Sequence, residues 1–210
     1  MLSWKRAGAA AAVLAGGLLW LVGSPSPAER LAAQDAALEA RLQAGEPQLR
    51  PEELLELAHN TSVRLRLLDL REENEFNLFH ILDARRATLA ELADRRFAAG
   101  LPRDAVVVVV SNGEGRAREG WKLLAAQRVP RVYLLAGGVH GWLTAFGGQG
   151  RLGPPRADCP LDDCRRYTFE AALGDRHPES DPGAGALAGR EFVRKVKLEA
   201  ATRRKAGSCG

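Results

Sequence analysis

Hydrophobic and polar residues along the middle of the chain form blocks that predict a parallel sheet. Residues 105–110 read AVVVVV, with polar residues on both sides. A short β-branched run of this kind is typical of a strand that is buried on both faces. Further strands are predicted over residues 63–69 and 132–136, where apolar residues also dominate.

Helical segments separate these predicted strands. Residues 51–60, 88–100 and 116–127 have the composition of helices. Alternating strands and helices imply right-handed crossovers, with helices on both faces of a parallel sheet. Ligands of such sheets bind beyond the carboxyl ends of the strands. We therefore expect the functional site in the loop that follows the valine strand.

The N-terminus has the pattern of a membrane anchor. Residues 7–23 form an uncharged run of 17 residues. A spanning helix needs about 20 residues, with a lower limit near 17, and a cleavable signal core has roughly 7 to 15. Lys5 and Arg6 precede the run, so the N-terminus is expected inside and the domain outside. Residues 1–27 are thus predicted to anchor the chain on the outer, periplasmic side of the membrane. Cleavage followed by secretion stays open as the alternative.

The pattern divides the rest of the chain into three parts. Residues 28–45 predict a helical stalk, because leucines recur on one narrow stripe. Residues 46–147 contain the strand and helix blocks and are predicted to be the folded domain. Residues 148–210 are rich in Gly and Pro and contain all three cysteines, as expected of a loose basic tail. Within it, residues 189–205 form a short amphipathic piece, predicted to be a terminal helix or strand.

Charge changes this picture little. The chain of 210 residues has a net charge of +4, and many of its basic residues lie in the last 21 positions. We expect no nucleic-acid partner from so mild an excess. The expected partner is the cell membrane, through the N-terminal helix.

The loop after the valine strand has the features of an anion site. A strand, a short Gly-containing loop and a helix start together direct backbone N–H groups and the positive end of a helix dipole toward one point. A cysteine at the first loop position would become a thiolate there. This chain has a serine, which stays protonated near neutral pH unless a base takes the proton. The predicted anion-binding loop comprises Ser111, Asn112, Gly113, Glu114, Gly115 and Arg116.

Two stretches of the chain resemble the rhodanese-like domain family. The string LLDLREENEFNLFHILDA, residues 67–84, is similar to the first half of its signature, and VVVVSNGEGRAREGWKLLAAQRVPRVYLLAGGVHGW, residues 107–142, to the second. The resemblance implies an α/β fold with a five-stranded parallel sheet and helices on both faces. In active members it implies sulfane-sulfur transfer through a persulfidated loop cysteine. The matching positions of the first half are Asp69, Arg71, Glu75, Phe76, His80 and Ile81.

The chain departs from the family pattern at the loop. Ser111 stands where active members carry cysteine, and the loop glycines fall at the third and fifth positions instead of the fourth. Leu82 and Asp83 replace the usual Pro-Gly pair, so this turn is expected to differ as well. The loop length, four residues between Ser111 and Arg116, still fits the sulfurtransferases, whereas the related phosphatases have five.

Each candidate residue has a catalytic and a structural interpretation. We expect Asp69 and Arg71 to form an ion pair that pins the strand to its loop, and His80 to satisfy a polar neighbour. Arg116 closes the anion loop and is a candidate anion contact. Ser111 is either a silent remnant or a hydrogen-bond donor to a bound anion.

The cysteines offer two further hypotheses. Cys159 and Cys164 are candidates for a small disulfide ring outside the cytoplasm. A zinc site is not expected, because only His177 is near and about four ligands are needed. Cys209, close to the C-terminus, is either an ordinary exposed thiol or a sulfur-carrying arm.

These observations favour a membrane-tethered, non-enzymatic module. We expect it to bind a sulfur-containing anion, a protein thiol or another protein, without a cofactor or metal. The alternative is a sulfurtransferase or thiol-redox enzyme that uses Cys209 as the carrier thiol.

Overall fold

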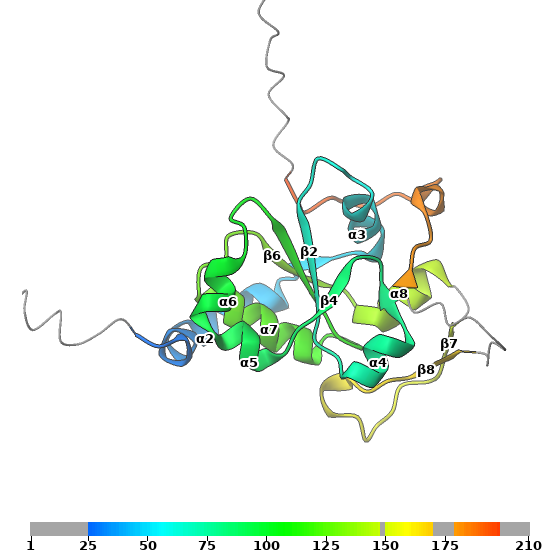
Figure 1. Ribbon diagram of the computed structural model, residues 1–210. Helices are drawn as coiled ribbons and strands as arrows, with labels where there is room; N and C mark the ends of the chain where they lie inside the picture. Colours follow the sequence, from blue (N-terminus) through cyan, green and yellow to red (C-terminus); the bar gives the residue numbers. More distant parts are fainter. Residues whose placement is uncertain (1–24, 148–149, 170–178, 198–210) are drawn as a thin grey trace, which may run out of the picture.

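The computed structural model describes residues 25–147, 150–169 and 179–197 (Figure 1). At its centre lies a five-stranded parallel sheet with the order β1-β6-β5-β2-β4. This confirms the α/β fold and the five-stranded sheet predicted from the sequence. The strands are β1 (Gln48–Leu49), β2 (Leu65–Asp69), β4 (Ala84–Arg86), β5 (Val106–Val110) and β6 (Val132–Leu135).

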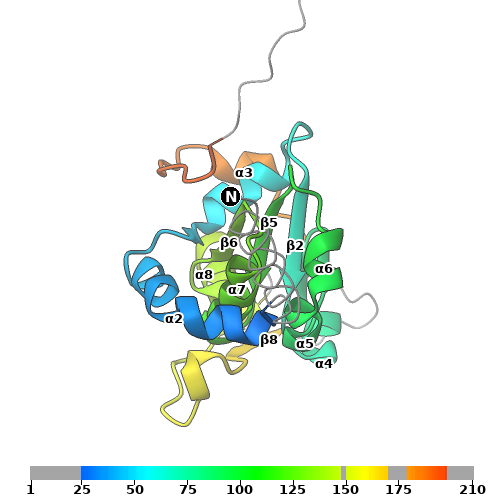
Figure 2. The same ribbon diagram turned by 90° about the vertical axis from the view of Figure 1, so that its left-hand side faces the viewer.

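Helices cover both faces of this sheet (Figure 1), and Figure 2 looks onto the face that carries α2 and α7. On one face lie α2, α5 and α7, and on the other α3 and α8. The chain also forms two small two-stranded sheets, in which β3 pairs with β9 and β7 pairs with β8. The helices are α2 (Pro27–Gln43), α3 (Pro51–Ala58), α4 (Glu73–Leu78), α5 (Leu89–Ala93), α6 (Arg95–Gly100), α7 (Gly115–Ala126) and α8 (Gly138–Phe146). The remaining elements are β3 (His80–Ile81), β7 (Gly150–Leu152), β8 (Tyr167–Phe169), β9 (Glu179–Ser180) and the 3-10 turns η1 (Pro160–Asp162) and η2 (Ala184–Leu187).

The valine strand β5 is the central strand, and all five of its side chains are buried. Because side chains alternate across a strand, Val106, Val108 and Val110 join the core under α3 and α8. Val107 and Val109 join the core under α2, α5 and α7. Both faces of β5 are therefore apolar, which explains the unbroken run of valines.

The helix predicted over residues 88–100 is in fact two helices. Asp94 has extended backbone angles, φ −72° and ψ 124°, and ends α5. Its side chain accepts a hydrogen bond from the Arg96 N–H, at 2.8 Å, and so caps α6. Aspartate is a preferred N-cap because it satisfies such free N–H groups, and composition alone did not show this break.

The predicted stalk forms a helix but is not a free spacer. α2 begins with a capping box between Ser26 and Glu29. Farther along, Leu38 and Leu42 are buried against α7, and Lys122 of α7 forms ion pairs with Asp35 and Glu39. The leucine stripe thus packs on the domain, and the folded unit begins well before residue 46.

Two described segments of the predicted loose tail, residues 150–169 and 179–197, are also docked on the domain. Tyr167 of β8 and Val196 are buried in the core under α3. Glu53 of α3 accepts hydrogen bonds from the N–H groups of Lys195 and Val196, at 2.7 and 2.8 Å. Of the piece predicted to be a helix or strand, residues 189–197 form neither, and residues 198–205 lie outside the described ranges. Single anchoring residues hold this segment, and single residues leave no periodic signal in the sequence.

The N-terminal anchor prediction falls outside this structure. Residues 1–24, which include the apolar run, are not among the described residues. Within the described part of the chain, no helix combines the length and hydropathy needed to cross a membrane.

Candidate functional site

The loop after β5 is fixed against the start of α8. Two carbonyl groups of the loop, those of Ser111 and Asn112, accept hydrogen bonds from the N–H groups of Val139 and His140, both at 2.9 Å. Gly138 permits this approach. Its φ is +56°, and a Cβ atom there would collide with the carbonyl oxygen of Gly113. The loop therefore has a defined path although its glycines are shifted from the family pattern.

The hydroxyl of Ser111 is fully buried and serves the loop itself. Ser111 has an exposed fraction of 0%. Its Oγ accepts a hydrogen bond from the Ala117 N–H at 3.1 Å and donates one to the Gly113 carbonyl at 3.2 Å. No titratable side chain of the described residues forms a hydrogen bond with this hydroxyl. Within the described part of the chain, therefore, no base is hydrogen-bonded to Ser111 to remove its proton.

The loop does bind an anionic group, and that group is a carboxylate of the same chain. Asp163 accepts hydrogen bonds from the N–H of Gly113 at 2.8 Å and from the N–H of Arg116 at 3.2 Å, one on each carboxylate oxygen. The side-chain amide of Asn112 donates to the Asp163 carbonyl at 3.0 Å. The sequence predicted the donors of this anion site but missed their internal occupant.

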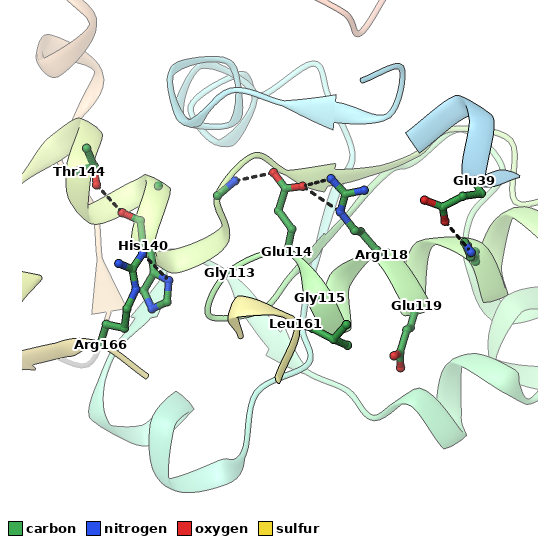
Figure 3. Close-up of a pocket in the computed structure, with 13 residues that line it drawn as sticks. Glu39, Gly113, Glu114, Gly115, Arg118, Glu119, His140, Thr144, Leu161 and Arg166 are labelled. Atoms are coloured by element: carbon green, nitrogen blue, oxygen red, sulfur yellow. Dashed lines mark hydrogen bonds and ion pairs between the residues drawn. The ribbon is translucent and has the colours of Figure 1, made fainter. Parts of the chain in front are cut away.

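Asp163 belongs to a small ring that lies against the loop. Cys159 and Cys164 are joined by a disulfide, with their Cα atoms 5.6 Å apart. At the tip of the ring, Leu161 contacts Gly115, the first residue of α7. A Cβ atom on Gly115 would clash with Leu161, so glycine allows the ring to approach the helix start. Figure 3 shows Leu161 beside Gly115 at the edge of a hollow.

The side chain of Arg116 points to a different partner. Its guanidinium donates to the carbonyl of Leu70 at 3.0 Å and pairs with Glu72 at 2.9 Å. Only its backbone N–H takes part in holding Asp163. The candidate anion contact therefore comes from the backbone of Arg116 and not from its charge.

A buried network of hydrogen bonds connects the loop to the end of β2. Arg71, only 2% exposed, binds both carboxylate oxygens of Asp69. Its guanidinium also donates to the carbonyl of Phe79 at 2.7 Å and to the hydroxyl of Tyr167. Tyr167 in turn donates to Oδ1 of Asn112 at 3.1 Å. The expected Asp–Arg pair is present, and Tyr167 extends it to the loop.

Burial affects the pKa values of two residues in this network, Arg71 and Tyr167. It opposes the charge of Arg71, but the Asp69 carboxylate and Tyr167 together more than compensate and keep the pKa of Arg71 raised. Burial also raises the pKa of Tyr167 to about 12, although the nearby Arg71 opposes this. Tyr167 is thus a neutral hydrogen-bond donor, and Arg71 a permanent cation. The sequence offered no sign of Tyr167, which lies 96 positions from Arg71.

His80 contacts its own turn and not the loop. Its Nδ1 lies 3.0 Å from the carbonyl of Phe76, and the two rings stack with centroids 4.1 Å apart. This agrees with the expectation that His80 satisfies a polar neighbour. In the turn where Leu82 and Asp83 stand, Asp83 adopts a φ of +60°, a region that glycine adopts more readily.

A cavity of about 750 Å³ opens beside the loop (Figure 3). Gly113, Glu114 and Gly115 form part of its wall, and Leu161 of the disulfide ring forms another part. Glu114 is fixed there, because its carboxylate binds the Gly137 N–H at 2.9 Å and Arg118 at 2.7 Å. Further charged side chains of both signs line the cavity: Glu39, Arg118, Glu119, Lys122 and Arg166.

Two other predictions concern thiols and metals. Cys209 lies outside the described residues, so its role stays a prediction. In the described ranges, no three side chains of His, Cys, Asp or Glu gather as metal ligands would.

Comparisons with known proteins found similar solved structures and one matching family model. The rhodanese-like domain of an Anabaena protein is 24% identical over 49% of this chain and 76% of its own, with a TM-score of 0.42. A rhodanese-related protein from Thermoplasma volcanium is 21% identical over 46% and 90%, with a TM-score of 0.40. A Rhodopseudomonas palustris protein described as a possible tyrosine phosphatase is 16% identical over 59% and 92%, with a TM-score of 0.42. No curated protein matches this chain. The family model of the rhodanese-like domain matches residues 50–145, and this part of the chain is therefore a rhodanese-like domain.

Proposed function

We propose that this protein is a membrane-anchored rhodanese-like module that binds an oxyanion or carboxylate group and does not transfer sulfur through its loop. The observation that carries the proposal is the state of Ser111. By its resemblance to the family, this residue takes the position of the loop cysteine, and among the described residues its buried hydroxyl is bonded only to backbone atoms.

The chemistry of sulfur transfer supports the inactive assignment. A sulfane sulfur is carried on a cysteine as a persulfide, and this needs a sulfur atom in the loop. A serine oxygen forms no such sulfur–sulfur bond. It would also need a base to become a nucleophile, and no titratable side chain among the described residues forms a hydrogen bond with the Ser111 hydroxyl.

The binding assignment is supported by Asp163. The loop already holds a carboxylate through two backbone N–H groups, those of Gly113 and Arg116. Carboxylates and other oxyanions present the same pair of acceptor oxygens to such donors. The loop therefore keeps the chemistry of anion recognition without a nucleophile.

The proposed location rests on the N-terminal sequence. Two basic residues before an uncharged run favour a single span with the domain on the outer face of the membrane. A disulfide between Cys159 and Cys164 is compatible with that compartment, because disulfides persist where the environment is oxidising.

The test is a thiosulfate-to-cyanide sulfur-transfer assay on the full chain, with Cys209 intact and with Cys209→Ser. We expect no turnover from either protein, while an active sulfurtransferase confirms that the assay works. Turnover that persists in Cys209→Ser would show that the domain itself catalyses transfer and would overturn the proposal. Turnover that depends on Cys209 would equally overturn it, in favour of the carrier-thiol enzyme.

A further inference from the structure

The disulfide ring and the anion-binding loop are connected at three points. Both carboxylate oxygens of Asp163 accept backbone N–H groups of the loop, and its carbonyl accepts the Asn112 amide. Asp163 is the residue next to Cys164, so the disulfide constrains the backbone that carries the carboxylate. An external anion that uses the same two N–H donors has to displace Asp163 first.

The ring holds an unfavourable backbone conformation. Leu161, at its tip, has a φ of +55°, a region that non-glycine residues rarely adopt. Leu161 is also 66% exposed, although one side of it touches Gly115. A linear chain would relax such a residue to negative φ, and this would move the ring residues relative to the loop. The closed ring prevents that relaxation.

A second attachment keeps the segment nearby when the ring is open. Tyr167 lies four positions after Asp163, is buried, and bonds to Arg71 and Asn112. These contacts do not involve the cysteines. Opening the ring is therefore expected to release Asp163 while Tyr167 stays in the core.

We infer that the Cys159–Cys164 ring is a redox-controlled lid, with Asp163 as the plug that competes with external oxyanions for the loop. The inference deepens the proposed function and rests on it, since it concerns regulation of the same anion site. While the ring is closed, Asp163 occupies the N–H groups of Gly113 and Arg116. When the ring is open, these donors are available to an external ligand.

The opening step is a thiol–disulfide exchange with a dithiol reductant. A thiolate of the reductant attacks one ring sulfur, and the other ring sulfur leaves as a thiolate and takes up a proton. The second thiol of the reductant then displaces the first ring cysteine from the mixed disulfide. Two electrons and two protons pass to Cys159 and Cys164, and the reductant becomes a disulfide.

Tethering explains why the closed lid excludes ligands. A group held beside its site acts at an effective concentration on the order of mM even on a flexible linker, and the ring is more rigid than that. Opening the ring lowers this effective concentration, because the residues around Asp163 gain freedom. The cavity beside Gly113, Gly115 and Leu161 provides an approach to the loop from outside.

Hydrogen exchange of the full chain tests whether Asp163 occupies the loop. Mass spectrometry of peptides covering residues 111–117 reports how well the N–H groups of Gly113 and Arg116 are protected. The oxidised wild type should exchange slowly at the Gly113 and Arg116 amides. Cys159→Ser combined with Cys164→Ser, and separately Asp163→Ala, should raise exchange at least tenfold. Adding inorganic sulfate should slow exchange in these variants and leave the oxidised wild type unchanged.

Asp158→Ala is the matched control. Asp158 lies in the same segment but pairs with Arg156, not with the loop, so its exchange should equal that of wild type. Equal exchange in the oxidised wild type and the double serine variant would overturn the lid. Slow exchange in Asp163→Ala would overturn the plug.

The two proposals fail in different ways. Sulfur transfer by the reduced wild type would refute the non-catalytic function while leaving the lid intact, as a gate over an active site. An unchanged exchange rate without sulfur transfer would refute the lid alone.

Discussion

The hydroxyl of Tyr167 accepts a hydrogen bond from the buried guanidinium of Arg71. The same hydroxyl donates to Asn112 in the anion-binding loop, at 3.1 Å. Because Arg71 is held by Asp69 at the end of β2, the C-terminal segment joins two neighbouring strand ends. One phenol thus couples the docked tail to the site.

Replacing this phenol should destabilise the protein. Tyr167→Phe leaves a guanidinium N–H and the Asn112 oxygen without their partner, and a lost partner of a buried polar group costs about 1–3 kcal/mol. Tyr133→Phe is the control, because the hydroxyl of Tyr133 has no hydrogen bond within the described residues. Chemical denaturation should show the loss for Tyr167→Phe only. An equal effect in both variants would contradict the coupling.

Alkaline pH should weaken the fold through the same residue. The pKa of Tyr167 is raised by burial to about 12, against about 10 in an unfolded chain. Its contribution to stability is therefore complete below about pH 10 and is lost as the pH rises toward 12. The free energy of unfolding should fall more steeply over this window in wild type than in Tyr167→Phe. Phenolate absorbance, followed by titration, should show one tyrosine ionising near pH 12; full ionisation near pH 10 would disprove the shift.

Gly138 should be intolerant of any side chain. Gly138→Ala places a Cβ against the Gly113 carbonyl at a positive φ, and we expect a loss of at least about 2 kcal/mol. Gly185→Ala serves as the control, because nothing lies within 4 Å of the place that a Cβ atom would take there and its φ is not positive. Thermal unfolding of both variants gives the comparison. A stable Gly138→Ala protein would contradict the close approach of loop and helix.

A thiol at position 111 should report on the lid. In a Cys209→Ser background, Ser111→Cys should alkylate slowly at neutral pH, because position 111 is fully buried and Asp163 occupies the N–H groups of Gly113 and Arg116 in the same loop. Adding Asp163→Ala should speed alkylation at least tenfold, since thiolate character is favoured at a helix N-terminus once an access path exists. Stopped alkylation read by mass spectrometry measures both rates. Fast reaction in the presence of Asp163 would mean that the plug does not block access.

The membrane topology can be tested independently of the loop. A reporter that is active only outside the cytoplasm, fused after Gly210, should be active, because Lys5 and Arg6 precede the apolar run. Neutral replacements at both positions should reduce that activity. An inactive reporter on a stable fusion would reverse the proposed orientation.

The sequence pattern was sufficient for three strands of the large sheet, β2, β5 and β6, and for the position of the loop, but it did not predict the short strands β1 and β4. The valine run, the alternating blocks and the Asp69–Arg71 pair each carry a local signal, and the structure contains all three. These features depend on residues that lie close together in the chain or repeat with a fixed period.

The occupant of the site could not be found in the same way. Asp163 and Tyr167 each contribute one side chain from a segment without apolar periodicity, and Asp163 reaches the loop from 50 residues away. One signal was present: an aspartate inside CPLDDC, in a chain whose predicted anion loop begins with serine. Its meaning depends on the folded path of the ring, which spacing alone does not determine.

The docked C-terminal segment changes what counts as the smallest foldable unit. A protein cut at residues 50–145, the span of the family match, would keep every strand of the large sheet except β1 but lose the partners of its buried polar groups. Arg71 would lack Tyr167, and Glu53 would lack the N–H groups of residues 195 and 196. Buried groups left without partners are costly. The unit that satisfies them begins with α2 and ends near Val196, so an excised domain should be drawn to those limits.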